Sequence, residues 1–192
     1  MVDVCRFYAN QGRSNNTTRS KPLDSEKKYL DLLKEVEETS IEDIASRLDF
    51  KPVQKKPNTY KYVTGPVDDM PEFTYTVADR KQRVDTFTSE GFETSNVAEL
   101  GDIIMSGPTK EKYVLKPAKF LTKYTGKIGG DVVPEQSYRL VAKYTEPKTV
   151  KFMAPWDELM VMRPGDYLVQ DGAKGYYRIA AAEYDMTYGP LR

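Results

Sequence analysis

Two aspartates that each follow a glycine are the residues best placed for chemistry. Asp102 lies in "LGDIIMSG", and Asp166 lies in "PGDYLVQDG", 64 residues later. Two carboxylates brought together across a pseudo-twofold axis could act as an acid–base pair. A carboxylate that follows a glycine at a turn more commonly accepts backbone N–H groups. We favour this structural role, so the sequence predicts no catalytic residue.

The second candidate site is residues 110–127, "KEKYVLKPAKFLTKYTGK", in which lysines alternate with aromatic residues. Such a run can bind single-stranded nucleic acid through stacking and charge. It can also contact an acidic protein surface. The favoured interpretation is a solvated strand face with aromatic side chains buried beneath it. The candidate contact residues in this run are Tyr113, Lys116, Lys119 and Lys123.

The composition excludes several classes of site. The chain contains one cysteine, Cys5, and no histidine. Cys5 cannot form an internal disulfide or a multi-cysteine metal site. Without histidine, the usual catalytic triads and histidine-ligated zinc are excluded. The formal net charge is zero, so no overall basic field attracts nucleic acid. We expect a non-catalytic protein without cofactor or metal.

The chain shows no feature of membrane insertion or secretion. No apolar run reaches the length that spans a bilayer, and residues 1–16 lack the apolar core of a secretory signal. The scarcity of acidic residues before Asp24 resembles an organellar presequence only weakly, and a polar tail is the preferred interpretation. We expect an intracellular protein, or one within a viral or organellar assembly.

An internal repeat links the two Gly-Asp sites. Residues 101–124 align with residues 165–188 at an offset of 64 without a gap, and Val77-Ala78 aligns with Val141-Ala142 at the same offset. The identical positions are Gly101/Gly165, Asp102/Asp166, Lys110/Lys174, Tyr113/Tyr177, Ala118/Ala182 and Tyr124/Tyr188. We interpret residues 73–126 and 127–192 as two copies of one unit.

Local residue preferences predict how each copy folds. Pro164-Gly165 suits the centre of a type II turn, whereas Leu100 replaces the proline in the first copy. A strand over 167–170 and a return strand over 176–180 should flank a hairpin turn begun by Asp171-Gly172. Residues 181–186 should form a helical turn that carries Tyr184 onto the sheet, and Tyr188 should close the unit.

Residues 164–188, with "PGDYLV", "YYRI" and "EYDMTY", resemble the PGDYG-type proteins of phages, large viruses and scattered cellular genomes. The matching positions are Pro164, Gly165, Asp166, Tyr167, Tyr177, Glu183, Tyr184, Thr187 and Tyr188. The copy at 100–124 is degenerate, with Leu100 for the proline and Ile103 for the aromatic residue. That family has no assigned activity, so the resemblance implies a fold unit and a phage or viral context.

The segments before the repeat should form an arm. We expect a polar extended tail over 1–22, a helical arm over 23–50 and a linker with two prolines over 51–72. Thr39 could cap the second helix of the arm, with Glu42 completing a capping box. From Phe73 onward, alternating apolar and polar residues predict strands. The expected fold is mainly β (α+β): a tandem duplication of a small β unit with an N-terminal helical arm.

These features favour an interaction or assembly subunit of a larger complex. Residues 1–48 would bind other protein subunits, because narrow apolar stripes on short helices are marginal without packing. The first alternative is a small-ligand or nucleotide-binding protein with its site at the Gly-Asp corners. The second is a single-stranded nucleic-acid binder through residues 110–127. Further candidate contact residues are Gly165, Asp166, Tyr167, Tyr177, Tyr184, Tyr188, Asp102 and the only tryptophan, Trp156.

Overall fold

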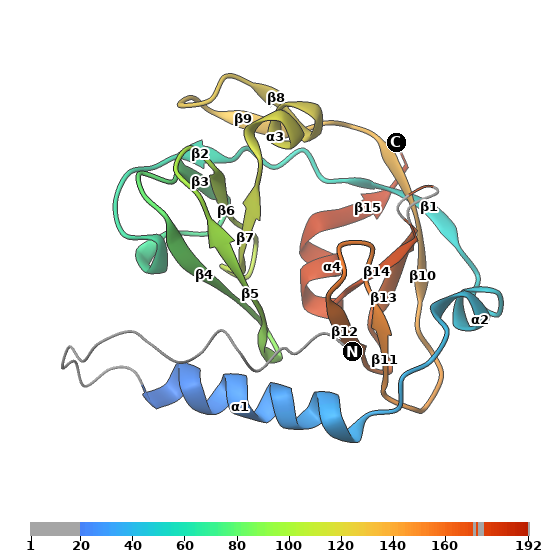
Figure 1. Cartoon of the computed structure of the whole chain (residues 1–192). Coiled ribbons are helices and arrows are strands. Elements are labelled where there is room, and N and C mark those ends of the chain that lie inside the picture. The colour runs from blue at the N-terminus through green and yellow to red at the C-terminus, as the bar shows by residue number, and fades with distance from the viewer. Residues whose placement is uncertain (1–19, 171, 173–174, 192) are drawn as a thin grey trace.

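The chain is mainly β, as expected, with short helices between and before the strands (Figure 1). The structure is a computed structural model that describes residues 20–170, 172 and 175–191. Within this part of the chain, no helix is both long and apolar enough to cross a membrane. Residues 1–19 of the expected tail (1–22) and the first residue of the expected Asp171-Gly172 turn lie outside the described residues. The prediction of an extended tail is wrong for residues 20–22, which form the first turn of a helix.

Both copies of the repeat contain the same seven elements in the same order. In unit 1 (residues 73–126) these are β3 (Thr74–Val77), β4 (Gln82–Thr88), β5 (Gly91–Ala98), β6 (Ile103–Ser106), β7 (Lys112–Leu115), α3 (Pro117–Lys123) and β8 (Tyr124–Gly126). In unit 2 (residues 127–192) they are β10 (Tyr138–Lys143), β11 (Val150–Met153), β12 (Leu159–Met162), β13 (Tyr167–Gln170), β14 (Tyr176–Ile179), α4 (Ala181–Thr187) and β15 (Tyr188–Pro190). The predicted duplication is therefore confirmed.

Strand pairing is also shared between the units. The central strand β6 pairs antiparallel with β3 and β7, as β13 does with β10 and β14. The hairpin β4–β5 corresponds to β11–β12. Unit 2 also contains β9 (Val132–Pro134), which pairs with β8 of unit 1.

The offset of 64 does not hold upstream of the corners. Ala78 exchanges backbone hydrogen bonds with Gly101 and Asp102, and Tyr144 does the same with Gly165 and Asp166. Ala78 therefore corresponds to Tyr144, at an offset of 66, and the predicted match with Ala142 is wrong. The chain between this residue and the corner is two residues shorter in unit 2, because its β11–β12 hairpin is four residues shorter than β4–β5 while the segment before the hairpin is two residues longer.

The two Gly-Asp corners are the same type II turn. The N–H of Asp102 donates to the carbonyl of Glu99 at 3.0 Å, and the N–H of Asp166 donates to that of Arg163 at 3.0 Å. The glycines have φ of +86° at Gly101 and +98° at Gly165, which suits the third position of this turn. The type II turn therefore forms with Leu100 at its second position as well as with Pro164.

The helical arm packs on the β units. It consists of α1 (Ser20–Glu35) and α2 (Ile41–Ala45). Ile41, Ile44 and Ala45 are buried in one cluster with unit 2 residues, among them Tyr144, Phe152 and Leu168. The cap of α2 is Ser40, whose Oγ accepts the N–H of Asp43 at 3.4 Å, and the predicted cap Thr39 is wrong. Thr39 instead donates its N–H to the carbonyl of Lys151, which fixes the entry to the helix.

Parts of the expected linker form strands in the five-stranded sheet of unit 2 and the four-stranded sheet of unit 1. β1 (Lys51–Lys55) lies between β10 and β15 in the order β14-β13-β10-β1-β15. β2 (Lys61–Tyr62) pairs parallel with β3, and a 3₁₀ turn over Val67–Asp69 follows. Pro52 is tolerated because β15 pairs only with residues 53–55, so its missing N–H lies beyond that ladder. The linker interpretation is corrected for residues 51–55 and 61–62.

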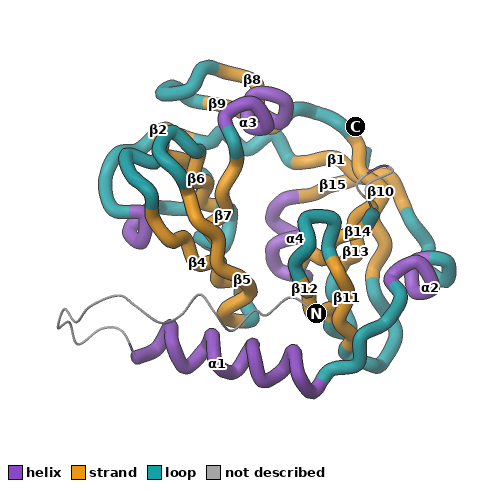
Figure 2. Tube along the Cα trace, viewed as in Figure 1, coloured by secondary structure: helices purple, strands orange, loops and turns teal. Residues whose placement is uncertain are grey.

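The two units lie side by side (Figures 1 and 2). Helix α1 runs along one side, while α3 and the β8–β9 hairpin lie along the opposite side. The phenol of Tyr29 in α1 donates to the carbonyl of Leu159 in unit 2, and Ser25 accepts the N–H of Phe92 in unit 1. Helix α1 therefore bridges the two units.

Candidate functional site

The candidate site is a cavity of about 500 Å³ between the two units. Unit 1 contributes β5, β7 and α3, and unit 2 contributes β12, β14 and α4. Tyr29 of α1, Lys55 of β1 and Tyr60 also line the cavity. This volume falls in the range of small-molecule sites in proteins.

The two copies turn the same face toward this cavity. Six positions of unit 1 and their equivalents 64 residues later all line it: Tyr113/Tyr177, Val114/Arg178, Leu115/Ile179, Lys119/Glu183, Lys123/Thr187 and Tyr124/Tyr188. The tyrosines are identical in the two copies, whereas the charges differ. The cavity is therefore pseudo-symmetric in shape and asymmetric in charge.

The end of the cavity between β1 and α3 carries three lysines and one glutamate, Glu111. Lys55, Lys119 and Lys123 all line it, and the Lys55 ammonium lies 5.8 Å from the centroid of the Tyr124 ring. Burial, together with the charges of Lys123 and Arg139, lowers the pKa of Lys55 to about 8, and the charge of Glu111 opposes this shift. Lys55 is therefore a cation in a place that disfavours charge.

Three tyrosine hydroxyls lie at the same end. Tyr60, Tyr113 and Tyr124 line the cavity, and the hydroxyls of Tyr113 and Tyr124 are 2.9 Å apart. Burial raises the pKa of Tyr124 to about 12 and raises the pKa of Tyr60 and Tyr113 as well. All three phenols are therefore neutral at physiological pH and can donate hydrogen bonds.

A buried arginine joins the units at the opposite end. Arg178 donates from Nε to Asp166 Oδ2 at 2.7 Å and from a terminal nitrogen to Glu93 Oε1 at 2.6 Å, and it also contacts Glu90. Burial alone would lower the pKa of Arg178, but these carboxylates raise it above its usual value. Burial raises the pKa of Glu93, and Arg178 opposes that shift.

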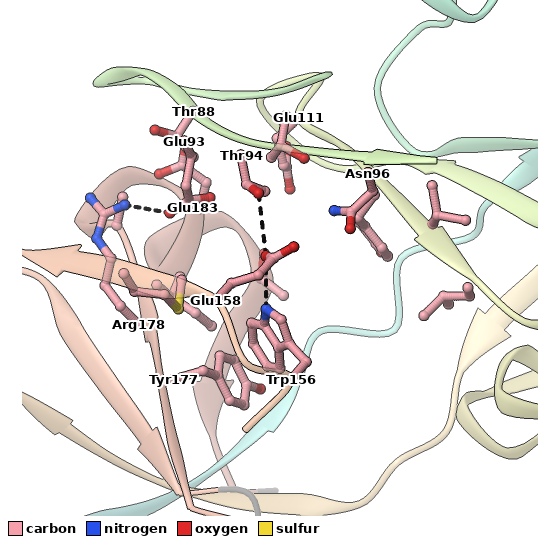
Figure 3. A pocket seen from close by; sticks show the side chains of 18 of the residues that line it. Thr88, Glu93, Thr94, Asn96, Glu111, Trp156, Glu158, Tyr177, Arg178 and Glu183 are labelled. Carbon is pink, nitrogen blue, oxygen red and sulfur yellow. Dashed lines mark hydrogen bonds and ion pairs between the residues drawn. The ribbon is translucent and has the colours of Figure 1, made fainter. Parts of the chain in front are cut away.

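Two further carboxylates of unit 2 hold residues of unit 1. Glu183 accepts the N–H of Ser89 at 2.8 Å and the hydroxyl of Thr109 at 2.9 Å. Glu158 Oε2 accepts the hydroxyl of Thr94 at 3.2 Å and the indole N–H of Trp156 at 3.0 Å (Figure 3). These contacts fix the cavity wall and hold the indole beside the cavity.

Half of the sequence-predicted contact residues line this cavity. They are Tyr113, Lys119, Lys123, Trp156, Tyr177 and Tyr188. Tyr167 and Tyr184 instead stack at 3.6 Å between ring centroids, and Tyr184 stacks on Tyr188, in the aromatic core of unit 2.

The Gly-Asp corners lie outside the cavity lining. Asp102 and Asp166 are buried, and each accepts the N–H of the residue three positions earlier, at 2.9 and 2.8 Å. Lys116 donates to Asp102 at 2.7 Å, as Arg178 does to Asp166. Burial would raise the pKa of Asp102, but the hydrogen bonds from Lys116 and from the N–H of Glu99 lower it below its usual value. Each aspartate thus serves its own turn, and the two do not form a carboxylate pair.

The sequence reasoning missed Lys55, Tyr60, Glu93, Glu158 and Arg178. The aligned repeat contained a clue to Arg178, because it stands where unit 1 has Val114. An arginine at an inward position of a strand predicts a buried partner. Lys55 had no such clue, because its segment was interpreted as a linker.

Comparisons with protein families, with curated proteins and with solved structures found no match. The resemblance to the PGDYG-type proteins therefore stays a prediction. Within the described part of the chain, no cluster of three or more cysteine, histidine or acidic residues is arranged to hold a metal ion.

Proposed function

We propose that the protein is a non-catalytic binding protein whose small-molecule ligand occupies the cavity between its two units. The observation that carries this proposal is that equivalent faces of both copies, 113–124 and 177–188, line one cavity. A duplicated unit that encloses a space between its copies can bind a ligand with contacts from both sides. Small-molecule sites commonly lie at such junctions.

The wall of the cavity favours a ligand with a planar, polar part. Tyr113 and Tyr177 approach from the two units, and Trp156 lies beside Tyr177 with ring centroids 5.8 Å apart. Aromatic side chains bind planar groups by stacking or edge contacts. Glu158 and Glu183 of unit 2 already accept hydrogen bonds from protein groups. This arrangement is better suited to binding a ligand than to transferring protons.

The assembly function expected from the sequence depended on an N-terminal arm that stands away from the β units, and the described part of this arm packs on unit 2 instead. Ile44 is fully buried against unit 2, and residues 51–55 form an internal strand. The segment expected to reach a neighbouring subunit is therefore used, from residue 20 onward, to hold this chain together. Assembly through residues 1–48 becomes the second proposal.

Single-strand nucleic-acid binding also has less support. Lys112 is buried and donates to the carbonyl of Lys110 at 2.7 Å and to the hydroxyl of Ser106 at 3.0 Å. Lys116 is bound to Asp102. The lysines of residues 110–127 therefore face different surroundings and do not form one continuous basic strip.

The only tryptophan makes the proposal directly testable. Trp156 lies at the cavity, so its fluorescence should report occupancy. The chain is titrated with a panel of nucleosides, mononucleotides, aromatic amino acids and sugar phosphates. We expect at least one class to change the fluorescence saturably and to raise the melting temperature.

Two variants provide the comparison. Tyr177→Ala should weaken the response, whereas Tyr138→Ala should leave it unchanged, because Tyr138 is exposed and outside the cavity. The proposal fails if no member of the panel changes either signal and native mass spectrometry of the purified chain detects no bound small molecule.

A further inference from the structure

We infer that the ligand of this cavity carries a phosphate group and that Lys55, with Lys119 and Lys123, binds it. The inference rests on the proposed function and specifies its ligand. The observation behind it is the placement of Lys55 on β1.

Lys55 is on the inward side of its strand. Side chains two residues apart on a strand share a face, so Lys55 shares the face of Val53. Val53 is buried in a cluster with Val141, Val169 and Tyr188. β1 is paired on both sides, to β10 and to β15, so its backbone cannot rotate Lys55 into solvent.

The positive charge of Lys55 is not balanced by an ion pair. Its one direct partner among the described residues is the ring of Tyr124, and no carboxylate of that part of the chain lies within salt-bridge distance. The charges of Lys123 and Arg139 further disfavour the positive charge of Lys55, and the charge of Glu111 opposes them with a smaller effect. A half-buried lysine without a counter-charge is costly, so its presence favours an anionic ligand.

Phosphate fits this end of the cavity best. Three ammonium groups act as point charges without the planar geometry by which an arginine selects a carboxylate. The neutral hydroxyls of Tyr60, Tyr113 and Tyr124 lie at the same end, and because one of the Tyr113–Tyr124 pair donates to the other, the remaining protons are the ones that can be donated to a ligand. Together they can serve the several oxygens of one phosphate.

The comparison of the two copies indicates which end of the cavity would hold the phosphate. Unit 1 has Lys119 and Lys123 where unit 2 has Glu183 and Thr187. Glu183 is bound to Ser89 and Thr109 of unit 1. The cation-rich end therefore belongs to α3 and β1, and the uncharged part of the ligand should extend toward Trp156 and Tyr177.

The test uses inorganic phosphate and pyrophosphate with the full chain, by calorimetry at neutral pH and constant ionic strength. We expect saturable binding, with acetate markedly weaker. Lys55→Met should raise the dissociation constant roughly ten- to hundredfold, as for the loss of one charge-assisted hydrogen bond. Lys55→Arg should keep part of the affinity, because it keeps the charge. Lys148→Met is the matched control, because Lys148 is exposed and outside the cavity.

The outcomes separate this inference from the proposed function. Lys55→Met should fold with an unchanged or higher melting temperature, since it removes an unbalanced half-buried charge. If phosphate binds Lys55→Met and wild type equally, or binds neither, the inference is overturned. If the panel still changes the fluorescence of Trp156 in that case, the cavity remains a binding site for a ligand without phosphate. Equal binding of acetate and phosphate would also overturn the assignment.

Discussion

Replacement of Arg178 by valine tests whether the buried ion pairs hold the two units together. Valine is the residue at the equivalent position of unit 1, Val114, so the strand can accept it. The side chain of Arg178 is 3% exposed, and that of Asp166 is 2% exposed. Removal of one partner from a buried ion pair costs about 3–5 kcal/mol, because the remaining charge is left unpaired.

This loss is a large part of the stability of a typical domain. The free energy of unfolding of a typical native domain is about 5–15 kcal/mol. Urea unfolding followed by circular dichroism and by the fluorescence of Trp156 should therefore show a much lower midpoint for Arg178→Val. The matched control is Lys116→Met, which removes the cation from Asp102. The Lys116 side chain is 65% exposed, whereas that of Asp102 is only 5% exposed, so we expect a loss clearly smaller than that of Arg178→Val.

The pH dependence provides an independent check. Burial raises the pKa of Glu93, and Arg178 opposes that shift, so the variant should raise it further. A carboxyl group with a raised pKa in the folded state costs stability as the pH rises through that pKa. The defect of Arg178→Val should therefore be largest at neutral pH and shrink on acidification. A loss below about 1 kcal/mol, or one that does not change with pH, would refute the reasoning.

Three further predictions concern the corners, the arm and the basic end of the cavity. Gly101→Val and Gly165→Val should lower the melting temperature to a similar extent, each costing about 1–3 kcal/mol, because both positions have positive φ; clearly unequal losses would show that the corners differ. Ile44→Ala should destabilise the whole chain by about 2–5 kcal/mol in one cooperative transition, whereas separate melting of the arm would show that it is not part of the core. Sulfate, whose charge is constant above neutral pH, should bind less tightly as the pH rises through about 8, because Lys55 then loses its proton; the absence of this decline in calorimetry would show that Lys55 is not the cation used. The groups that face Lys55 are Lys123, Arg139, Glu111 and Tyr124.

The parts of the fold that depend on local chemistry could be predicted from the sequence. A glycine with positive φ, followed by a turn-capping aspartate, specifies the corner with few alternatives. The elements after each corner follow at a constant offset of 64, from β6 and β13 to β8 and β15. Of the tyrosines that line the cavity, Tyr113, Tyr177 and Tyr188 could be predicted as contact residues because they recur at that offset, whereas Tyr29 and Tyr60 have no equivalent in the repeat.

The parts that depend on distant pairing could not be predicted. β1 is a strand because it pairs with residues 138–141 on one side and 188–190 on the other. Two prolines and three lysines within 51–60 locally favour a linker. The burial of Lys55 follows from that pairing alone. The cavity likewise depends on how the two units face each other, which no local pattern encodes.

The unequal hairpins explain why two copies of one unit carry different charges at equivalent positions. The β4–β5 hairpin of unit 1 is the longer one, and its turn residues Ser89 and Glu90 contact Glu183 and Arg178 of unit 2. In unit 1, the position of Glu183 is occupied by Lys119 and that of Arg178 by Val114, and both residues line the cavity. A single long hairpin can bind only one of the two copies. The corresponding positions of the other copy do not have this structural role, and Lys119 at one of them lines the cavity.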